Sequence, residues 1–174
     1  MTVSEEIKLQ AKLLEWEAPK GLSANLKGYN AGDYIWVTNC IVVARISCSY
    51  YMLNVSWHES IKELTTLPED AVKGWLTPIQ WKDNEYGVYA KVEAYDMSIW
   101  VTVDNLELFG NGDYDYDVWI DRTGKFLWLT EMGKKEVIGV IAGIRGINER
   151  LEELRKRNKK GDKKWTKLKQ LAEF

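Results

Sequence analysis

The sequence predicts an α+β fold, in which an antiparallel β-sheet of five to seven strands is combined with an N-terminal helix, short central helices and a long C-terminal helix. The middle of the 174-residue chain holds stretches of alternating apolar and polar residues that are rich in β-branched and aromatic side chains. After Gly133 the apolar spacing changes from two residues to three and four. Helices and strands do not alternate in the middle, which favours antiparallel pairing. We therefore expect an aromatic-rich α+β domain over residues 1–133 and a basic helical extension over residues 134–174.

The N-terminus is predicted to be helical. Thr2 and Glu5 have the spacing of a capping box, in which each side chain accepts a hydrogen bond from the backbone of the other residue. Apolar residues then recur at helical intervals, namely Ile7, Ala11 and Leu14. A proline and a glycine end this helix, and the Gly, Asn and Ser of residues 22–32 are typical of a loop.

The next segment, residues 33–57, is predicted to form two strands. Its β-branched and aromatic run is too long for one ordinary strand of about five or six residues, so we expect a turn or bulge around Arg45–Ser49. Residues 59–76 have apolar spacings of three and four, with Pro68 where a first helical turn tolerates it. This pattern predicts one or two short helices, and a strand over residues 79–82 is expected to follow.

Two hairpins are predicted after these helices. Residues 88–103 alternate strictly between apolar and polar side chains around a turn at Asp96–Ser98, as expected of a hairpin with one buried and one solvated face. The solvated face is predicted to carry Tyr89, Lys91, Tyr95 and Trp100. The segments YDVWID and KFLWLT flank a turn in which Gly124 can supply a positive φ.

The C-terminal extension carries the pattern of a helical zipper. Its apolar residues alternate at spacings of three and four over nearly three heptads, at Val137, Val140, Ile144, Ile147, Leu151 and Leu154. We interpret them as a dimerisation seam that makes the chain a homodimer. The alternative is an ordinary amphipathic helix that folds back on its own core.

Charge and motifs narrow the class of function. The net charge is −2, yet residues 134–169 hold thirteen Lys and Arg against five Asp and Glu. No membrane span or secretory signal is recognisable, so a cytoplasmic protein is expected. The phosphate-binding, dinucleotide-binding and nucleophile-elbow motifs are absent, and His58 is the single histidine. We therefore expect no enzymatic activity, no cofactor and no metal, and we interpret the acidic run NGDYDYDVWID as an edge that discourages aggregation.

Aromatic residues and cations together indicate nucleic-acid binding. The chain has nine Trp, nine Tyr and three Phe. Flat rings on rigid strands can stack on unpaired bases, while cations replace the counterions of phosphates. Because the body is acidic, single strands of DNA or RNA are a better match than a duplex. The predicted binding residues are Trp36, Arg45, Tyr50, Trp57, Tyr89, Lys91, Tyr95, Trp100, Arg122 and Lys125.

The order of elements resembles that of the ThermoDBP-type single-stranded DNA-binding proteins of Thermoproteales archaea. The shared features are an N-terminal helix, a central aromatic-rich antiparallel sheet and a zipper-like helix over Val137–Leu154. The resemblance is one of architecture and assigns no binding residue. It implies a thermophile's dimer that clamps single strands in an aromatic-lined cleft flanked by basic residues.

Two other functions are compatible with the same residues. The chain could be a non-enzymatic protein-interaction or assembly factor, for example a viral one, whose C-terminal helix pairs with a partner and whose aromatic residues form the core. It could also be a β domain that binds a small molecule or a carbohydrate, because tryptophan platforms stack on sugar rings as well.

Overall fold

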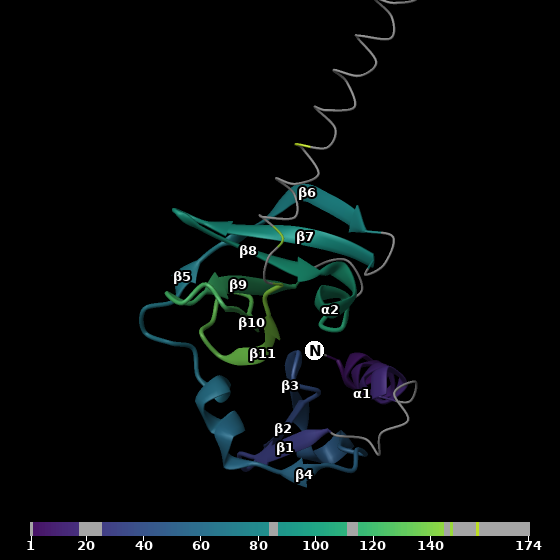
Figure 1. Cartoon of the computed structure of the whole chain (residues 1–174). Coiled ribbons are helices and arrows are strands. Elements are labelled where there is room, and N and C mark those ends of the chain that lie inside the picture. Colours follow the sequence, from purple (N-terminus) through teal and green to yellow (C-terminus); the bar gives the residue numbers. More distant parts are fainter. Residues whose placement is uncertain are drawn as a thin grey trace, which may run out of the picture. The chain divides into compact units, whose positions relative to one another are not determined.

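The computed structural model describes residues 2–17, 26–83, 87–110 and 115–144, together with Ile147 and Lys156. The chain divides into two compact units, Met1–Gly143 and Ile144–Phe174. The elements of the first unit are shown in Figure 1, and the fold described below is that of this unit.

The larger of two sheets has eight strands in the order β4-β1-β2-β3-β11-β10-β9-β5. The strands are β1 (Lys27–Asn30), β2 (Tyr34–Thr38), β3 (Val42–Ser47), β4 (Ser56–Trp57), β5 (Val72–Lys73), β9 (Tyr116–Ile120), β10 (Phe126–Glu131) and β11 (Val137–Ala142). Neighbours pair antiparallel except β1 and β4, which pair parallel, so the sheet is mixed.

The smaller sheet has three antiparallel strands in the order β6-β7-β8. They are β6 (Trp75–Asp83), β7 (Gly87–Ala94) and β8 (Met97–Thr102). The inward side chains of β7 and β8, such as Val92 and Val101, share one core with Val118 and Leu127 of the larger sheet. The smaller sheet therefore lies as a second layer beside β9 and β10 (Figure 1).

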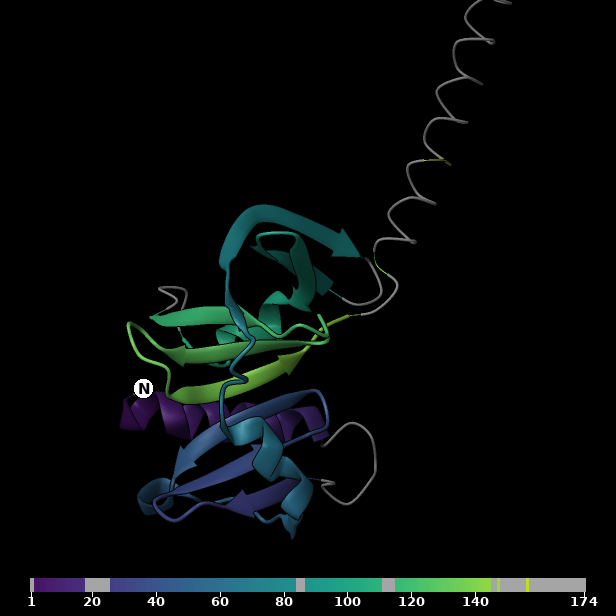
Figure 2. The same cartoon turned by 90° about the vertical axis from the view of Figure 1, so that its left-hand side faces the viewer.

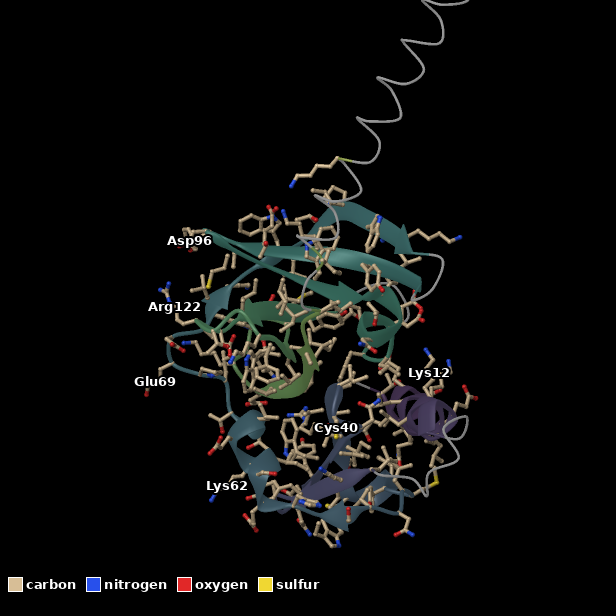
Figure 3. All side chains as sticks on the ribbon, viewed as in Figure 1. Lys12, Cys40, Lys62, Glu69, Asp96 and Arg122 are labelled. Atoms are coloured by element: carbon tan, nitrogen blue, oxygen red, sulfur yellow. The ribbon has the colours of Figure 1, made fainter. Side chains whose placement is uncertain are left out.

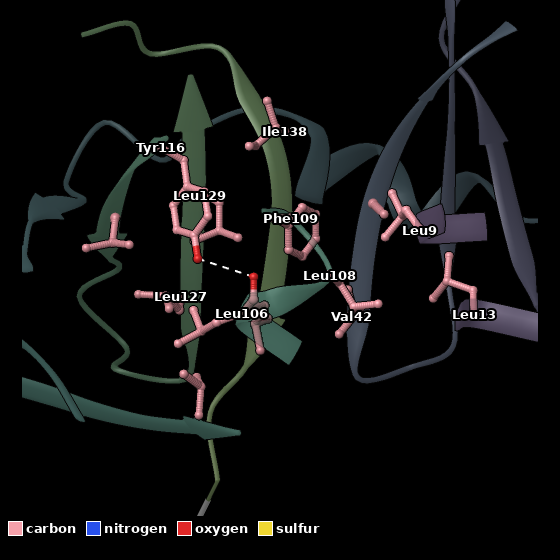
Figure 4. Packing of buried hydrophobic residues seen from close by; sticks show 14 of the residues in the cluster. Leu9, Leu13, Val42, Leu106, Leu108, Phe109, Tyr116, Leu127, Leu129 and Ile138 are labelled. Carbon is pink, nitrogen blue, oxygen red and sulfur yellow. Dashed lines mark hydrogen bonds between the residues drawn. The ribbon is translucent and has the colours of Figure 1, made fainter. Parts of the chain in front are cut away.

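Helices close the ends of this core. The predicted N-terminal helix is confirmed as α1 (Val3–Glu17), and its capping box forms, because Thr2 N–H donates to Glu5 Oε2 at 2.6 Å and Glu5 N–H donates to Thr2 Oγ1 at 3.3 Å. Leu9 and Leu13 of α1 are fully buried in the same core as Val42 (Figure 4). The short helix α2 (Val103–Glu107) follows β8 and is capped by the Thr102 hydroxyl, which accepts from Asn105 N–H.

The connection from β4 to β5 covers the opposite face of the larger sheet. It holds the 3-10 helix η3 (Glu59–Thr65), while a shorter one, η2 (Cys48–Tyr50), follows β3. Ile61 of η3 packs with Trp36, Trp128, Val137 and Val140 in a second buried cluster. The predicted short central helix is thus the 3-10 helix η3, which covers a buried cluster that includes Trp36 and Trp128.

Both predicted hairpins are confirmed. β7 and β8 pair from Tyr89 opposite Thr102 to Ala94 opposite Met97. β9 and β10 pair around a turn in which Gly124 has φ 64°, a left-handed conformation that favours glycine. The β7–β8 segment has the clearest two-residue alternation in the sequence, and the β9–β10 segment has a recognisable turn. Both pairings join strands that are adjacent in sequence, so they need only a short turn.

The predicted fold class is wrong in three respects. The described residues contain eleven strands in two sheets instead of five to seven in one, and the larger sheet is mixed rather than antiparallel. The predicted long C-terminal helix is wrong at its start, because Val137–Ala142 form β11 in the middle of the larger sheet, between β3 and β10. Five of these six residues are buried, and in a strand covered on both faces a continuous apolar run replaces alternation. Beyond Ile144 only Ile147 and Lys156 are described, and both are helical.

The described part of the chain includes no helix of the length and apolarity that crossing a membrane requires.

An ion-paired cluster beside β3 and β10 makes stability depend on pH. The Glu131 carboxylate accepts hydrogen bonds from Lys134 Nζ at 2.8 Å and from Arg45 Nη2 at 2.9 Å. These two cations lower the pKa of Glu131 from 4.5 to about 2, and Lys134 has the larger effect. A carboxyl group with a lowered pKa in the folded state stabilises the fold above its unfolded pKa, and this contribution disappears as the pH falls through the folded value.

We therefore expect Glu131→Gln to remove about 1 to 2 kcal/mol of stability at neutral pH, after allowance for partial solvent screening. The same variant should lack the part of the acid-induced loss that Glu131 contributes in the wild-type protein between about pH 4.5 and about pH 2. Urea denaturation at about pH 7 and about pH 3 measures both effects, with Glu63→Gln as an exposed-glutamate control. An unchanged pH dependence in Glu131→Gln would contradict this account.

Candidate nucleic-acid interface

The outer face of the three-stranded sheet gathers aromatic residues from all three strands. Side chains of directly paired residues project from the same face of a sheet. Trp75 lies opposite Glu93, Trp81 opposite Tyr89, and Lys91 opposite Trp100. We call this surface the aromatic face, and define it by Trp75, Trp81, Tyr89, Lys91, Glu93 and Trp100.

Period-two alternation accounts for this gathering. On β7 the odd-numbered residues face outward and the small or branched residues between them, Ala90 and Val92, are buried at 1% and 0% exposure. The pairing of β6 with β7 shifts between Leu76 and Gln80, beside Pro78, which has no N–H for the ladder. The shift adds two residues to β6, so Trp75 and Trp81 stay on the same face. In Figure 2 β6 bends strongly along its length.

The rings of the aromatic face differ in accessibility. Trp75 is 53% exposed, whereas Tyr89 and Trp100 are 4% and 7% exposed. Trp81 is partly buried and stacks on Tyr89 with ring centroids 5.2 Å apart and planes 21° apart. Trp100 Nε1 has no hydrogen-bond partner among the residues that the structure describes. On this face the indole of Trp75 is therefore exposed, and the indole of Trp81 is partly exposed and stacks on the ring of Tyr89.

Charge on the aromatic face is balanced internally. Lys91 Nζ lies 2.7 Å from Glu93 Oε1. This ion pair neutralises Lys91, the one cation among the six residues that define the face.

Four of the ten residues predicted to bind nucleic acid belong to this region. Tyr89, Lys91 and Trp100 are on the face, and Tyr95, 88% exposed with φ 50°, is in the turn at its end. Sequence reasoning placed Tyr89 and Trp100 on a solvated surface, but both are buried.

The other six lie on the larger sheet and its surroundings. Trp36 is 4% exposed beneath η3, and Arg45 is held by Glu131 and by the Tyr34 ring, whose centroid lies 4.3 Å from the guanidinium carbon. Tyr50 in η2 and Trp57 in β4 are 41% and 58% exposed. The remaining two, Arg122 and Lys125, are exposed around the β9–β10 turn, where Figure 3 shows Arg122 projecting outward.

Sequence reasoning missed Trp75 and Trp81. Trp75 lies at the end of residues 59–76, which were predicted to be helical. Trp81 lies in the predicted strand of residues 79–82, and Pro78 interrupts the alternating pattern just before it. The available signal was the pair of indoles six residues apart next to the clearest hairpin in the chain.

The residues of the predicted dimerisation seam lie in different parts of the chain. Val137 and Val140 belong to β11, inside the first unit. Ile144 is partly buried, Ile147 is helical and 4% exposed, and Leu151 and Leu154 lie outside the described residues.

A small cavity opens beside Trp75, where the chain passes from β5 to β6 along the edge of β9. Its volume is about 140 Å³, and it is lined by Gly74, Trp75, Leu76, Leu106, Tyr116, Asp117 and Val118. The Tyr116 hydroxyl donates to the Leu106 carbonyl at 3.3 Å and so ties α2 to β9 at its wall (Figure 4).

Asp117 of β9 is held by two partners, Gly133 and Lys73. Its Oδ2 accepts from Gly133 N–H at 2.9 Å and lies 3.1 Å from Lys73 Nζ. Partial burial acts to raise the pKa of Asp117, but the Gly133 hydrogen bond and the Lys73 ammonium outweigh it, so the pKa lies below its ordinary value. At neutral pH Asp117 is therefore an ionised acceptor.

No group of three or more His, Cys, Asp or Glu side chains within the described ranges is arranged to hold a metal ion. Comparisons with protein-family models, with curated proteins and with solved structures found no match to this chain.

Proposed function

We propose that the protein binds single-stranded nucleic acid, and that the aromatic face supplies the stacking platform. The observation that carries the proposal is Trp75, a tryptophan 53% exposed on a rigid strand, next to the stacked pair of Trp81 and Tyr89. A ring held by a strand loses little conformational freedom when a base stacks on it. Such stacking contributes about 1 to 3 kcal/mol per base.

The spacing of the two outer indoles supports this proposal. Trp75 and Trp81 lie opposite Glu93 and Tyr89, four residues apart on β7, which corresponds to about 13 Å along the strand. An extended single strand can span this length with a few nucleotides, so two of its bases could stack at once.

Positive charge for the phosphates is concentrated in the second unit. Residues 1–143 hold thirteen Lys and Arg against twenty-one Asp and Glu, whereas residues 144–174 hold eleven against five. We infer that the stacking and phosphate-binding functions are divided between the two units. Binding should therefore weaken as salt is raised, in proportion to the number of phosphates neutralised. A homodimer through the C-terminal residues remains part of this proposal.

The test replaces Trp75 and uses Trp57 as a matched control. Trp57 is equally exposed, at 58%, but lies on β4 at the edge of the larger sheet. Fluorescence anisotropy of end-labelled oligo(dT) is expected to show that Trp75→Ala weakens binding about tenfold, because one stacked base is lost. Trp57→Ala should bind as the wild-type protein does.

Two outcomes would overturn the proposal. One is wild-type protein that does not bind oligo(dT) at micromolar concentrations at low salt. The other is equal affinity of Trp75→Ala and Trp57→Ala, which would mean that the aromatic face takes no part.

A further inference from the structure

The Lys91–Glu93 ion pair lies beside the most exposed ring of the aromatic face. Trp75 and Glu93 are directly paired residues of β6 and β7, which places their Cβ atoms about 4.5 to 5.5 Å apart on the same side of the sheet. Lys91 is the neighbouring residue on that side of β7, and its Nζ lies 2.7 Å from Glu93 Oε1. A base that stacks on the Trp75 indole would therefore have this ion pair at its edge.

The ion pair presents hydrogen-bond acceptors next to a donor. A carboxylate only accepts hydrogen bonds, and an ammonium group only donates them. Among the residues that the structure describes, Lys91 is the partner of Glu93 through Oε1, and Oε2 accepts no hydrogen bond. The side chains of Lys91 and Glu93 are 25% and 32% exposed, so a ligand on this face can reach both of them.

We propose that the aromatic face binds a guanine base on Trp75 and recognises its pairing edge through Glu93 and Lys91. The inference rests on the proposed function and names the base that this face prefers. Guanine is the base whose pairing edge carries two adjacent donors, N1–H and the 2-amino group, next to the acceptor O6. A carboxylate can accept from both donors at once, while Lys91 Nζ donates to O6.

The other bases match less of this arrangement. Adenine has two rings for stacking as guanine does, but its edge has one amino donor beside the acceptor N1. Cytosine likewise has one amino donor beside the acceptor N3. Thymine and uracil have one N–H between two carbonyl oxygens. Each of these edges gives the carboxylate a single donor, so one charge-assisted hydrogen bond is lost relative to guanine.

Strands that differ in one kind of base test the preference in the wild-type protein. Three oligo(dT) strands of equal length carry guanine, hypoxanthine or adenine at every fourth position, which avoids runs of guanine that associate with one another. Fluorescence anisotropy should show that the guanine strand binds about tenfold more tightly than the adenine strand. Hypoxanthine keeps N1–H and O6 but lacks the 2-amino group, so its strand should bind with intermediate affinity. All three bases are purines, so their stacking areas are similar.

The variant Glu93→Gln then assigns the preference to the carboxylate. Glutamine has nearly the same size but replaces one acceptor oxygen by an amide donor, so the guanine and adenine strands should bind within about twofold of each other. The substitution also releases Lys91, so plain oligo(dT) should bind at least as tightly as it does to the wild-type protein. Glu63→Gln removes the same charge from an exposed residue of η3 and should keep the preference.

The outcomes separate this inference from the proposed function. Wild-type protein that binds none of the strands, plain oligo(dT) included, contradicts the proposed function itself. Equal affinity of the wild-type protein for guanine and adenine strands, equal affinity for guanine and hypoxanthine strands, or a guanine preference that survives in Glu93→Gln contradicts the guanine site and leaves single-strand binding intact. The wild-type comparison does not depend on whether a variant folds.

Discussion

A chain that ends at Gly133 is expected to lose cooperative unfolding, whereas a chain that ends at Gly143 is expected to keep it. The ten residues between these two ends contain β11, which pairs with β3 on one side and with β10 on the other. Without β11 the order of strands is broken in the middle, and β1–β4 lose their link to β5, β9 and β10 within the larger sheet.

The energetic cost of this truncation exceeds the margin of a typical domain. Val137, Ile138, Val140 and Ile141 of β11 are at most 5% exposed. Each such side chain contributes about 1.5 to 3 kcal/mol on burial, so roughly 6 to 12 kcal/mol is lost, compared with a total stability of about 5 to 15 kcal/mol. The unpaired backbones of β3 and β10 add to this loss and expose edges that favour aggregation.

Urea denaturation followed by circular dichroism distinguishes the two chains. The chain ending at Gly143 retains the bonds from Ala142 N–H to the Ile41 carbonyl and from Gly143 N–H to the Lys125 carbonyl, and should unfold in one transition. A folded, cooperative chain ending at Gly133 would contradict the central place of β11. It would instead favour the helical extension that the heptad spacing predicts.

This contrast shows where local pattern stops being informative. α1, the β7–β8 hairpin and the β9–β10 hairpin were predicted correctly, because capping, alternation and turn residues act between neighbours in sequence. β11 was not predicted, because its sequence VIGVIA is apolar at every position except one glycine. Such a run is compatible both with a buried helix and with a strand that is covered on both faces. Its pairing with β3, almost a hundred residues earlier, decides between them.

The candidate site was predicted in part for the same reason. Alternation placed Tyr89, Lys91 and Trp100 on one face correctly, since it reports the direction of a side chain relative to its own strand. It carries no information about what covers that face, and so it did not indicate that Tyr89 and Trp100 are buried while Trp75 is open. The pairing of Arg45 with Glu131, 86 residues apart, is equally invisible in local sequence.

Gly139→Ala is expected to destabilise the fold, although alanine usually stabilises a strand relative to glycine. A Cβ at position 139 would overlap the ring of Phe109 at Cε1 and Cζ, and would lie 3.0 Å from the Val43 carbonyl oxygen. Phe109 is 4% exposed within the main core, and Val43 O is part of the backbone of β3, so neither can move away easily.

The sign of this effect follows from two opposing magnitudes. Replacing glycine stabilises by about 0.4 to 1 kcal/mol, because the unfolded chain loses conformational freedom. Overpacking a buried site costs about 1 to 3 kcal/mol, and the overlap with Phe109 places Gly139 at the upper end of that range. The net loss is therefore expected to be about 2 to 2.6 kcal/mol, or roughly 5 to 10 °C in melting temperature.

Gly110→Ala is the matched control, since a Cβ at Gly110 would meet, among the described residues, only Tyr116 Cε1 at an ordinary 3.8 Å. Its stability should be unchanged or slightly raised. Combining Gly139→Ala with Phe109→Leu removes the ring atoms that the new methyl group overlaps, so the double variant should be less destabilised than the sum of the single variants. Such coupling is the mark of direct contact, and thermal and urea unfolding of the four proteins measure it. Strict additivity would mean that position 139 does not face Phe109, and the packing of β11 against the segment after α2 would have to be revised.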